Sequence, residues 1–267
     1  MMSKLEASAI QQALTSLAAA KLDQLEVFDD IPSTNSYLLS KPAPSPGRFR
    51  VAVADHQTAG RGRHDRKWIT VPGSGLCLSF AYTFDRMPDQ LPALTLAIGV
   101  GVVAALQQLN IDNISLKWPN DIVALDGKLG GILTEVRSGG GDGVTVVTGI
   151  GLNVHIPEDM DVGAESEWAH RATDLHSISP ELPARELLAG TMVEHLFATF
   201  EKFDALGFAG FAAAWRQQDW LRGREIDVDM PNEQASGIAA GVDVDGALIV
   251  DTQSGPVRVV SGSISIR

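Results

Sequence analysis

The sequence predicts an α/β fold of the α+β kind, in which a mixed or antiparallel sheet packs against helices and a small β-barrel follows. Apolar, strand-like runs such as Phe49–Ala54 alternate with helical segments in the first part of the chain. Turn signals at Asp126-Gly127 and Gly139–Gly143 then join three consecutive apolar runs, which is typical of an antiparallel meander. Beyond Trp220 only short β segments separated by turns remain, a spacing typical of a small barrel.

Composition is that of an ordinary globular protein, with 267 residues of which 45% are hydrophobic and 20% charged. The formal net charge of −12 argues against nonspecific nucleic-acid binding, which needs a broad basic face. The single Cys77 excludes an intrachain disulfide framework and a cysteine zinc site. No secretory signal opens the chain, so we expect a cytoplasmic protein.

The first helices and strands are predicted from the spacing of apolar residues and from capping and turn residues. The helical spacing of apolar residues over Ser3–Leu22 predicts one helix, and the first strand is expected to begin near Leu25. Ser33-Thr34-Asn35 fits the N-cap of a short helix. The proline-rich segment Lys41–Gly47 predicts a loop that leads into the strand Phe49–Ala54.

An uncharged stretch between Asp89 and Asp112 is long enough to cross a bilayer. It contains three glutamines and an asparagine, is rich in Ala and Gly, and has no flanking cationic bias. We therefore expect a helix over Leu94–Leu109 that is buried in a soluble core. Further along, Leu182–Phe203 predicts a long amphipathic helix and Phe208–Trp215 a short one.

The most unusual stretch is Gly60–Trp68, which reads GRGRHDRKW and concentrates positive charge in an acidic chain. Its glycines permit close approach of the backbone to a ligand, and its arginines match carboxylate or phosphate oxygens bidentately. We interpret it as a loop that a bound anion orders. The alternative is a solvated basic loop, because runs of charge often serve only solubility.

Three glycine-rich or polar strand segments accompany this loop. Lys117–Asp121 (KWPND) places a cation, an amide and a carboxylate at a strand end, although Pro-Asn-Asp is also ordinary turn chemistry. After Lys128, the pair Gly130-Gly131 leaves a strand without bulk, which invites a ligand or another backbone, or marks a bulge at a sheet corner. Asn153 ends the apolar run that contains Gly149 and Gly151, so its side chain is satisfied by backbone or reaches a ligand.

Other catalytic patterns are missing from the sequence. There is no GxxxxGK[ST] phosphate loop, strand-anchored GxGxxG, HExxH, CxxC or GxSxG, and the six histidines show no metal-ligand spacing. What remains is a site of Arg, Lys, Asn and Gln around glycine-rich strands. Such a site is suited to holding anions and stabilising charge in a transition state.

Together these stretches resemble biotin protein ligases, which adenylate biotin and attach it to a lysine of a carrier domain. The matching motifs, in the family's order, are Ser33-Thr34-Asn35, Gln57, GRGRxxRKW from Gly60 to Trp68, KWPND from Lys117 to Asp121, KLGGIL from Lys128 to Leu133, and GIGLNV from Gly149 to Val154. The family often has glycine where Asp65 stands and alanine where Gly130 stands. The resemblance covers about residues 25–267 and implies a catalytic domain binding biotin and ATP (25–219) and an SH3-like C-terminal domain (220–267), so residues 1–24, with their predicted helix, form an N-terminal helical extension.

The resemblance also implies residue roles, with Lys128 and Arg63 as the catalytic residues. The implied biotin-binding residues are Ser33, Thr34, Asn35, Gln57, Arg61, Gly62, Arg63 and Lys128. The implied nucleotide-binding residues are Arg66, Lys117, Asn120, Asn153 and Trp168, of which Trp168 fits core packing equally well. The implied substrates are biotin and ATP with Mg²⁺, and no residue is assigned to the metal.

The implied reaction forms biotinyl-5′-AMP and transfers biotin to a lysine of a biotin carboxyl carrier protein, such as the acetyl-CoA carboxylase subunit. We expect no DNA or membrane partner and a monomer or homodimer, since regulatory members of the family carry an N-terminal DNA-binding domain for which this chain has no room. Three alternatives stay open: a lipoate or octanoate ligase, a biotin-responsive repressor, and a noncatalytic biotin-binding module.

Overall fold

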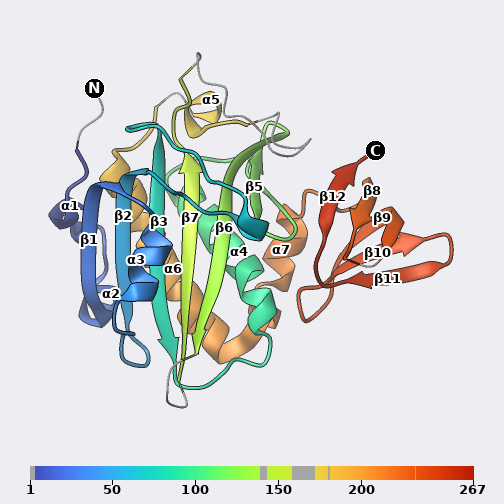
Figure 1. Ribbon diagram of the computed structural model, residues 1–267, viewed down its shortest axis with the longest axis horizontal. Coiled ribbons are helices and arrows are strands. Elements are labelled where there is room, and N and C mark those ends of the chain that lie inside the picture. Colours follow the sequence, from blue (N-terminus) through green and yellow to red (C-terminus); the bar gives the residue numbers. More distant parts are fainter. Residues whose placement is uncertain (1–3, 139–142, 158–171, 180, 232) are drawn as a thin grey trace.

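The computed structural model describes residues 4–138, 143–157, 172–179, 181–231 and 233–267. The chain forms a seven-stranded sheet of order β1-β2-β3-β7-β6-β5-β4 and a five-stranded sheet of order β11-β10-β9-β8-β12 (Figure 1). Only the β1–β2 pair of the larger sheet is parallel. The predicted fold class is confirmed. The smaller sheet keeps two edge strands, β11 and β12, so its pairing is that of an open sheet rather than a closed ring.

The bounds of the elements are as follows. The larger sheet contains β1 (Leu22–Ile31), β2 (Phe49–Gln57), β3 (Gly75–Phe84), β4 (Ser115–Lys117), β5 (Asp121–Ala124), β6 (Gly127–Ser138) and β7 (Val144–Asn153). The smaller sheet contains β8 (Glu225–Asp229), β9 (Gln234–Val242), β10 (Leu248–Thr252), β11 (Gly255–Val259) and β12 (Ser263–Ile266). The helices are α1 (Ala7–Gln12), α2 (Ser16–Lys21), α3 (Thr34–Ser40), α4 (Leu94–Gln108), α5 (Leu175–Ile178), α6 (Arg185–Leu206) and α7 (Ala212–Gln218), with 3₁₀ turns η1 (Arg63–Asp65), η2 (Leu91–Ala93) and η4 (Gly207–Gly210).

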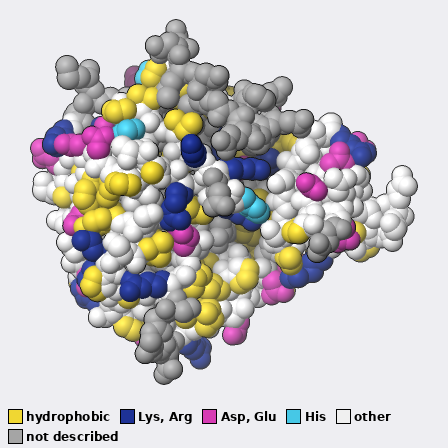
Figure 2. Space-filling model, viewed as in Figure 1, with side chains coloured by type: hydrophobic (Ala, Val, Ile, Leu, Met, Phe, Trp, Pro, Cys, Tyr) yellow, Lys and Arg dark blue, Asp and Glu magenta, His cyan; other side chains and the backbone are white. Residues whose placement is uncertain are grey.

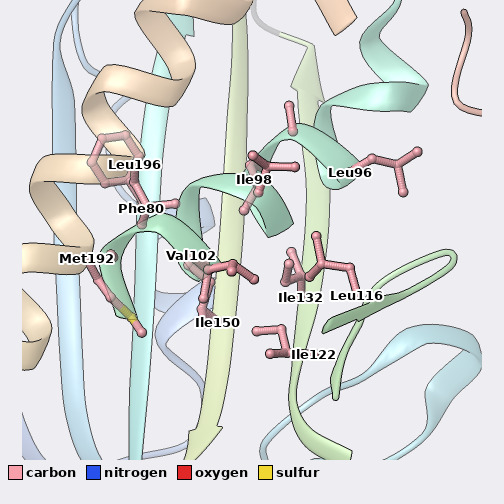
Figure 3. Packing of buried hydrophobic residues seen from close by; sticks show 14 of the residues in the cluster. Phe80, Leu96, Ile98, Val102, Leu116, Ile122, Ile132, Ile150, Met192 and Leu196 are labelled. Carbon is pink, nitrogen blue, oxygen red and sulfur yellow. The ribbon is translucent and has the colours of Figure 1, made fainter. Parts of the chain in front are cut away.

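The larger sheet is covered on both faces. Helices α4 and α6 pack on one face and α3 lies on the other (Figure 1). Side chains along β2 point alternately to the two faces. Val51 and Val53 belong to the main core, whereas Ala52 belongs to a small cluster with Leu38 of α3. Figure 3 shows the main core between the sheet and the two helices, with side chains such as Phe80, Ile150, Ile98 and Leu196.

Helix α4 lies within this core. Among the described residues, Leu91–Gln108 is the segment long and apolar enough to cross a membrane, with a mean hydropathy of 1.6, and 67% of it is buried inside the protein. It packs against α6 and β6. A helix that is apolar on all sides belongs in a protein interior, so the prediction of a buried core helix agrees with the structure.

The N-terminal prediction of a single helix is wrong. Two short helices, α1 and α2, occupy this segment, and β1 begins at Leu22 rather than near Leu25. Thr15 separates them, because its hydroxyl accepts a hydrogen bond from the Ala18 amide and so caps α2. The Thr15 hydroxyl and amide also donate to the Glu194 carboxylate on α6, which anchors this break to the core.

The predicted hairpin between β5 and β6 is present, with its turn one residue earlier than expected. Leu125 and Asp126 both have positive φ, 49° and 53°, as a two-residue hairpin turn of type I′ requires. A register shift then places Leu129 as an extra residue opposite β5. A bulge, one of the two alternatives given for Gly130-Gly131, is therefore present next to Gly130.

The smaller sheet is attached to the larger one at the end that carries β4. The Trp118 indole donates to the Gly246 carbonyl at 2.9 Å, and the Trp220 amide donates to the Leu116 carbonyl at 2.9 Å. Apolar side chains of β8, including Ile226 and Val228, belong to the main core cluster. The smaller sheet is thus packed beside β4 and β5 of the larger sheet.

Candidate active site

A cavity of about 830 Å³, here called the central cavity, lies over the α3 side of the larger sheet and reaches the smaller sheet. Its walls come from the start of α3, the loop Gly60–Trp68 (the basic loop), strands β4 to β7, and β12. Figure 2 shows Lys and Arg side chains gathered around the hollow between the two lobes of the molecule. The size is typical of a pocket for small ligands.

The structure brings the predicted site residues together around this cavity. Those that line it are Ser33, Thr34, Asn35, Gln57, Arg61, Gly62, Arg63, Arg66, Lys117, Asn120, Lys128 and Asn153. Trp168 lies outside the described residues, so its assignment stays a prediction. The residues come from six separate segments, and only the fold makes them neighbours.

One end of the cavity, the polar end, is formed by Ser33, Thr34, Asn35 and Gln57. The expectation that Ser33 caps a helix is confirmed, because its hydroxyl accepts from the Ser36 amide at 3.4 Å at the start of α3. The Thr34 amide and hydroxyl both donate to the Gln57 side-chain oxygen, at 2.8 and 3.1 Å. The polar groups at this end are therefore held by one another, which reduces the ordering that a ligand has to bring about.

Asn35 is held from both sides. Its amide nitrogen donates to the Leu133 carbonyl at 3.1 Å and to the Glu135 carboxylate at 2.8 Å, and its oxygen accepts from the Ser79 hydroxyl at 2.6 Å. Gly149 leaves the space for it, since a Cβ at that position would lie 2.4 Å from the Asn35 oxygen. Both amide hydrogens are used within the protein, so Asn35 shapes the cavity more than it offers free donors.

The basic loop is closed into a narrow hairpin. Arg61 and Lys67 form an antiparallel bridge, the Gly62 amide donates to the Arg66 carbonyl at 2.7 Å, and η1 forms the tip. Arg61 lines the cavity and makes a bidentate ion pair with Glu135, with N–O distances of 2.9 and 2.6 Å. A protein carboxylate thus holds the Arg61 guanidinium, and the assignment of Arg61 to biotin stays a prediction.

Arg63 is the cation of the loop that contacts Asn120 of the KWPND segment. Its guanidinium donates to the Asn120 side-chain oxygen at 3.4 Å. Burial lowers the pKa of Arg63, and the nearby Asp121 carboxylate opposes this shift. A guanidinium stays protonated even so, which leaves a desolvated positive charge beside the cavity.

Trp68 was not predicted as a site residue, yet it is part of the cavity wall. Its ring lies against Gly151, where a Cβ would come within 2.3 Å of the indole Cε2. The indole N–H has no hydrogen-bond partner within the described part of the chain. Cys77 also lines this wall, and burial raises the pKa of its thiol to about 11, so it is a neutral apolar surface.

Two lysines and one carboxylate occupy the middle of the cavity. The Lys128 ammonium lies 2.6 Å from the Asp121 carboxylate, which fixes its position. Lys117 donates to the Ile264 carbonyl of β12 at 3.3 Å. Burial lowers the pKa of Lys117 to about 8, although the attraction of Asp121 opposes the shift. Removing these charges from water therefore makes the middle of the cavity ready to receive anions.

Asn153 meets the first of the two alternatives given for it, and its contact with a ligand stays a prediction. Its side-chain nitrogen donates to the Lys128 carbonyl at 3.3 Å and to the Thr173 carbonyl at 3.0 Å, so backbone satisfies it. It also lines the cavity. Asn120 is similar, because its nitrogen donates to the Ile132 carbonyl at 2.9 Å while its oxygen accepts from Arg63.

The smaller sheet contributes a wall that sequence reasoning missed. Residues 262–266 and Asp229 line the cavity, together with Trp220 and Arg224 at the domain junction. The Arg224 guanidinium stacks 4.0 Å from the Trp220 ring. Nothing in the local pattern of β12 distinguishes it from an ordinary edge strand, so only the tertiary structure reveals this role.

Comparison with known proteins identifies the family. The model of the biotin/lipoate A/B protein ligase family matches residues 27–153, and the model of the biotin protein ligase C-terminal domain matches residues 222–267. A biotin–acetyl-CoA-carboxylase ligase of Mycobacterium tuberculosis is 34% identical over 248 residues, which span 90% of this chain and 88% of that protein. The chain belongs to the biotin protein ligase family.

Other family members extend the likeness. A bifunctional ligase/repressor of Salmonella typhimurium is 32% identical over 245 residues, covering 90% of this chain and 73% of that protein. Among solved structures, the biotin protein ligase of Aquifex aeolicus in complex with biotin and ATP has a TM-score of 0.73 and 28% identity, covering 92% of this chain and 99% of that one. The likeness thus extends over both sheets of this chain.

Proposed function

We propose that this protein uses ATP to activate biotin as biotinyl-5′-AMP and then transfers the biotinyl group to a lysine of a biotin carboxyl carrier protein of acetyl-CoA carboxylase. The observation that carries this proposal is the single cavity in which a pre-ordered polar end adjoins Arg63, Lys117 and Lys128. The name of the M. tuberculosis relative and the ligands of the A. aeolicus structure support the choice of substrates.

The chemical difficulty in the first step is that both reactants are anions. A biotin carboxylate oxygen attacks the α-phosphorus of ATP, a P–O bond forms, the bond to the β-phosphate oxygen breaks, and pyrophosphate leaves. Two unit charges 4 Å apart repel by about 4 kcal/mol at an effective dielectric constant of 20. Arg63, Lys117 and Lys128 supply the positive charge that cancels this repulsion and stabilises the charge that develops on the phosphoryl oxygens.

Asp121 positions the key lysine. Its carboxylate holds the Lys128 ammonium at 2.6 Å at the start of β5, so the ammonium does not have to be ordered when substrate arrives. Lys128 contacts the biotin carboxylate or the new acyl phosphate in our proposal, while Arg66, Lys117, Asn120 and Asn153 face the nucleotide. Acid–base or covalent catalysis by the protein is not required in this step.

Magnesium enters this scheme as part of the substrate, on the phosphates of ATP. Among the described residues, no three or more His, Cys, Asp or Glu side chains form a group that could hold a metal ion. Mg²⁺ typically uses one or two carboxylates together with substrate phosphates, so this donor set fits a phosphate-borne ion. Its contribution would be to neutralise phosphate charge.

In the second step a neutral lysine amine of the carrier attacks the acyl carbon of the mixed anhydride. A C–N bond forms, the bond to the phosphate oxygen breaks, AMP leaves, and the amine loses a proton to solvent. The basic loop and Trp68 cover the cavity during this step in our proposal and keep water from the anhydride. A cytoplasmic location, a monomeric or homodimeric state and the lack of a DNA partner remain predictions from the sequence.

The decisive experiment is mass spectrometry of a biotin carrier domain incubated with the protein, ATP, Mg²⁺ and either biotin or lipoate. We expect a mass increase of one biotinyl group that depends on ATP, and none when the acceptor lysine of the carrier is replaced by arginine. Modification with lipoate in place of biotin would overturn the assignment of substrate. Binding of biotin without consumption of ATP would overturn the assignment as an enzyme.

A further inference from the structure

Glu135 lies on β6 beside the central cavity and has no role in the scheme above. Its side chain projects to the α3 face of the sheet, where it reaches α3 and the basic loop. The side chain is 25% exposed, whereas that of its partner Arg61 is 41% exposed. Glu135 on strand β6 is thus the point at which α3 and the basic loop meet.

Three hydrogen bonds converge on this one carboxylate. Arg61 donates to Oε1 at 2.9 Å and to Oε2 at 2.6 Å, and the Asn35 amide donates to Oε2 at 2.8 Å. A bidentate guanidinium–carboxylate pair fixes orientation as well as distance. The Glu135 carboxylate therefore holds the basic loop and the polar end of the cavity in one arrangement.

The connection continues through the floor of the cavity. Asn35 accepts from Ser79 at 2.6 Å, Ser79 also lies 2.7 Å from the Thr34 hydroxyl, and Thr34 donates to Gln57. Ser79 is fully buried at 0% exposure, so these bonds are shielded from water. Each buried polar group has a partner, which makes the network rigid as long as all its members are present.

We propose that Glu135 is a positioning residue that couples closure of the basic loop to the arrangement of the polar end of the cavity. This inference rests on the proposed function, in which the polar end receives biotin and the loop covers the activated intermediate. Filling the polar end stabilises Asn35 in the orientation that supports Glu135. Glu135 in turn holds Arg61, and the loop stays closed while the anhydride is present.

The substitution Glu135→Gln separates the contact with Asn35 from the ion pair with Arg61. The amide oxygen still accepts from Asn35, but the charge that pairs with Arg61 is lost. Arg61→Gln removes the same ion pair from the loop side. Glu201→Gln is the matched control, because Glu201 accepts a hydrogen bond from Tyr82 at 2.5 Å among residues that do not line the cavity.

Limited trypsin digestion reads loop closure without any enzymatic activity, since the basic loop contains Arg61, Arg63, Arg66 and Lys67. Peptides that end in the loop are quantified by mass spectrometry with and without biotin. We expect biotin to protect the wild-type loop, and cleavage in Glu135→Gln to be about threefold to tenfold faster, the range expected for losing a partly exposed bidentate pair. Glu201→Gln should cleave like the wild type.

Two further results decide the proposal. Arg61→Gln and the double variant Arg61→Gln/Glu135→Gln should each show the same increase as Glu135→Gln, because all three lose one interaction. Equal cleavage of wild type and both single variants in the presence of biotin would overturn the role of Glu135, and Arg61→Gln carries this test if Glu135→Gln does not fold. Failure of biotin to protect the wild-type loop would instead contradict the proposed function.

The coupling also has a kinetic signature that a purely structural role would lack. We expect Glu135→Gln to release about threefold to tenfold more activated intermediate per biotin transferred, with the rate of pyrophosphate formation changed less. An equal fall in both steps, with an unchanged ratio of released to transferred product, would contradict it.

Discussion

The close approach of the Trp68 ring to Gly151 gives the sharpest test, the substitution Gly151→Ala. A Cβ at Gly151 would lie 2.3 Å from Cε2, 2.6 Å from Nε1 and 2.7 Å from Cζ2 of Trp68. Carbon atoms in contact are about 3.5 Å or more apart, so the ring has to retreat by more than about 1 Å. The Trp68 amide is bonded to the Gly60 carbonyl at 3.0 Å, so a displaced ring shifts the closing end of the basic loop.

A misplacement of about 1 Å at a catalytic constellation costs about 100-fold in rate, so we expect kcat/KM for biotin in Gly151→Ala to fall about 10- to 100-fold. Overpacking should lower the free energy of unfolding by about 1–3 kcal/mol. Steady-state pyrophosphate release and thermal unfolding measure the two effects. Circular dichroism confirms that the variant used in the kinetics is folded.

Gly131 provides a matched control, because it is paired with Gly151 across β6 and β7. A Cβ there would lie 3.5 Å from Lys128 Cε and 3.8 Å from the Trp68 ring, which is ordinary contact. Gly131→Ala should therefore stay within about threefold of the wild-type kcat/KM. The reasoning fails if Gly131→Ala loses as much activity as Gly151→Ala, or if Gly151→Ala matches the wild type. It also fails if Gly151→Ala costs as much activity in a Trp68→Leu background, where the colliding ring is gone, as it does in the wild type.

Three further predictions concern the cations. Lys128→Ala should lose about 100-fold or more in pyrophosphate release from biotin and ATP, the cost of removing an oxyanion-type donor, and a near wild-type rate would remove Lys128 from the mechanism. Arg63→Gly should still form the activated intermediate but release it into solution, and leakage equal to that of wild type would rule out the covering role. Burial lowers the pKa of Lys117 to about 8, so at pH 8 about half of this group is neutral before nucleotide binds. Nucleotide phosphate should raise that pKa and so cause uptake of about half a proton on binding. Calorimetry in buffers of different ionisation enthalpy measures this uptake. Lys117→Met should abolish it, and equal uptake in both proteins would contradict the assignment of Lys117 to the nucleotide.

Local chemistry explains which elements the sequence predicted well. Ser33 caps α3 because a hydroxyl at that position satisfies an amide of the first helical turn. The uncharged helix α4 is buried because it is apolar on every side. Asp126-Gly127 indicated a hairpin because turn residues interrupt alternating apolar runs. In each case residues within a few positions of one another decide the outcome.

The features that the sequence did not predict depend on contacts between residues that are distant in the sequence. The break between α1 and α2 was visible locally as Thr15-Ser16, but its bond to Glu194 spans 179 residues. Arg61 and Glu135 are 74 residues apart, and Lys117 and Ile264 are 147 apart. The motif residues could be assigned to one site by resemblance. Which of them point inward, and which are held by other protein groups, depends on strand order and register that the sequence does not display.

The glycines of the cavity show why pattern alone leaves the site undetermined. Gly149 and Gly151 are two residues apart, so both missing side chains lie on the same face of β7. The sequence predicted a ligand, another backbone or a bulge at the corresponding gap of Gly130-Gly131, and no such prediction was made for Gly149 and Gly151. The gap at Gly149 holds Asn35 and that at Gly151 holds Trp68, whereas a Cβ at Gly130 would meet the Gly151 carbonyl at 2.6 Å. Gly131 alone of these four has only ordinary contacts. The glycines therefore admit the two segments that shape the cavity, α3 and the basic loop, and Glu135 ties those segments to each other.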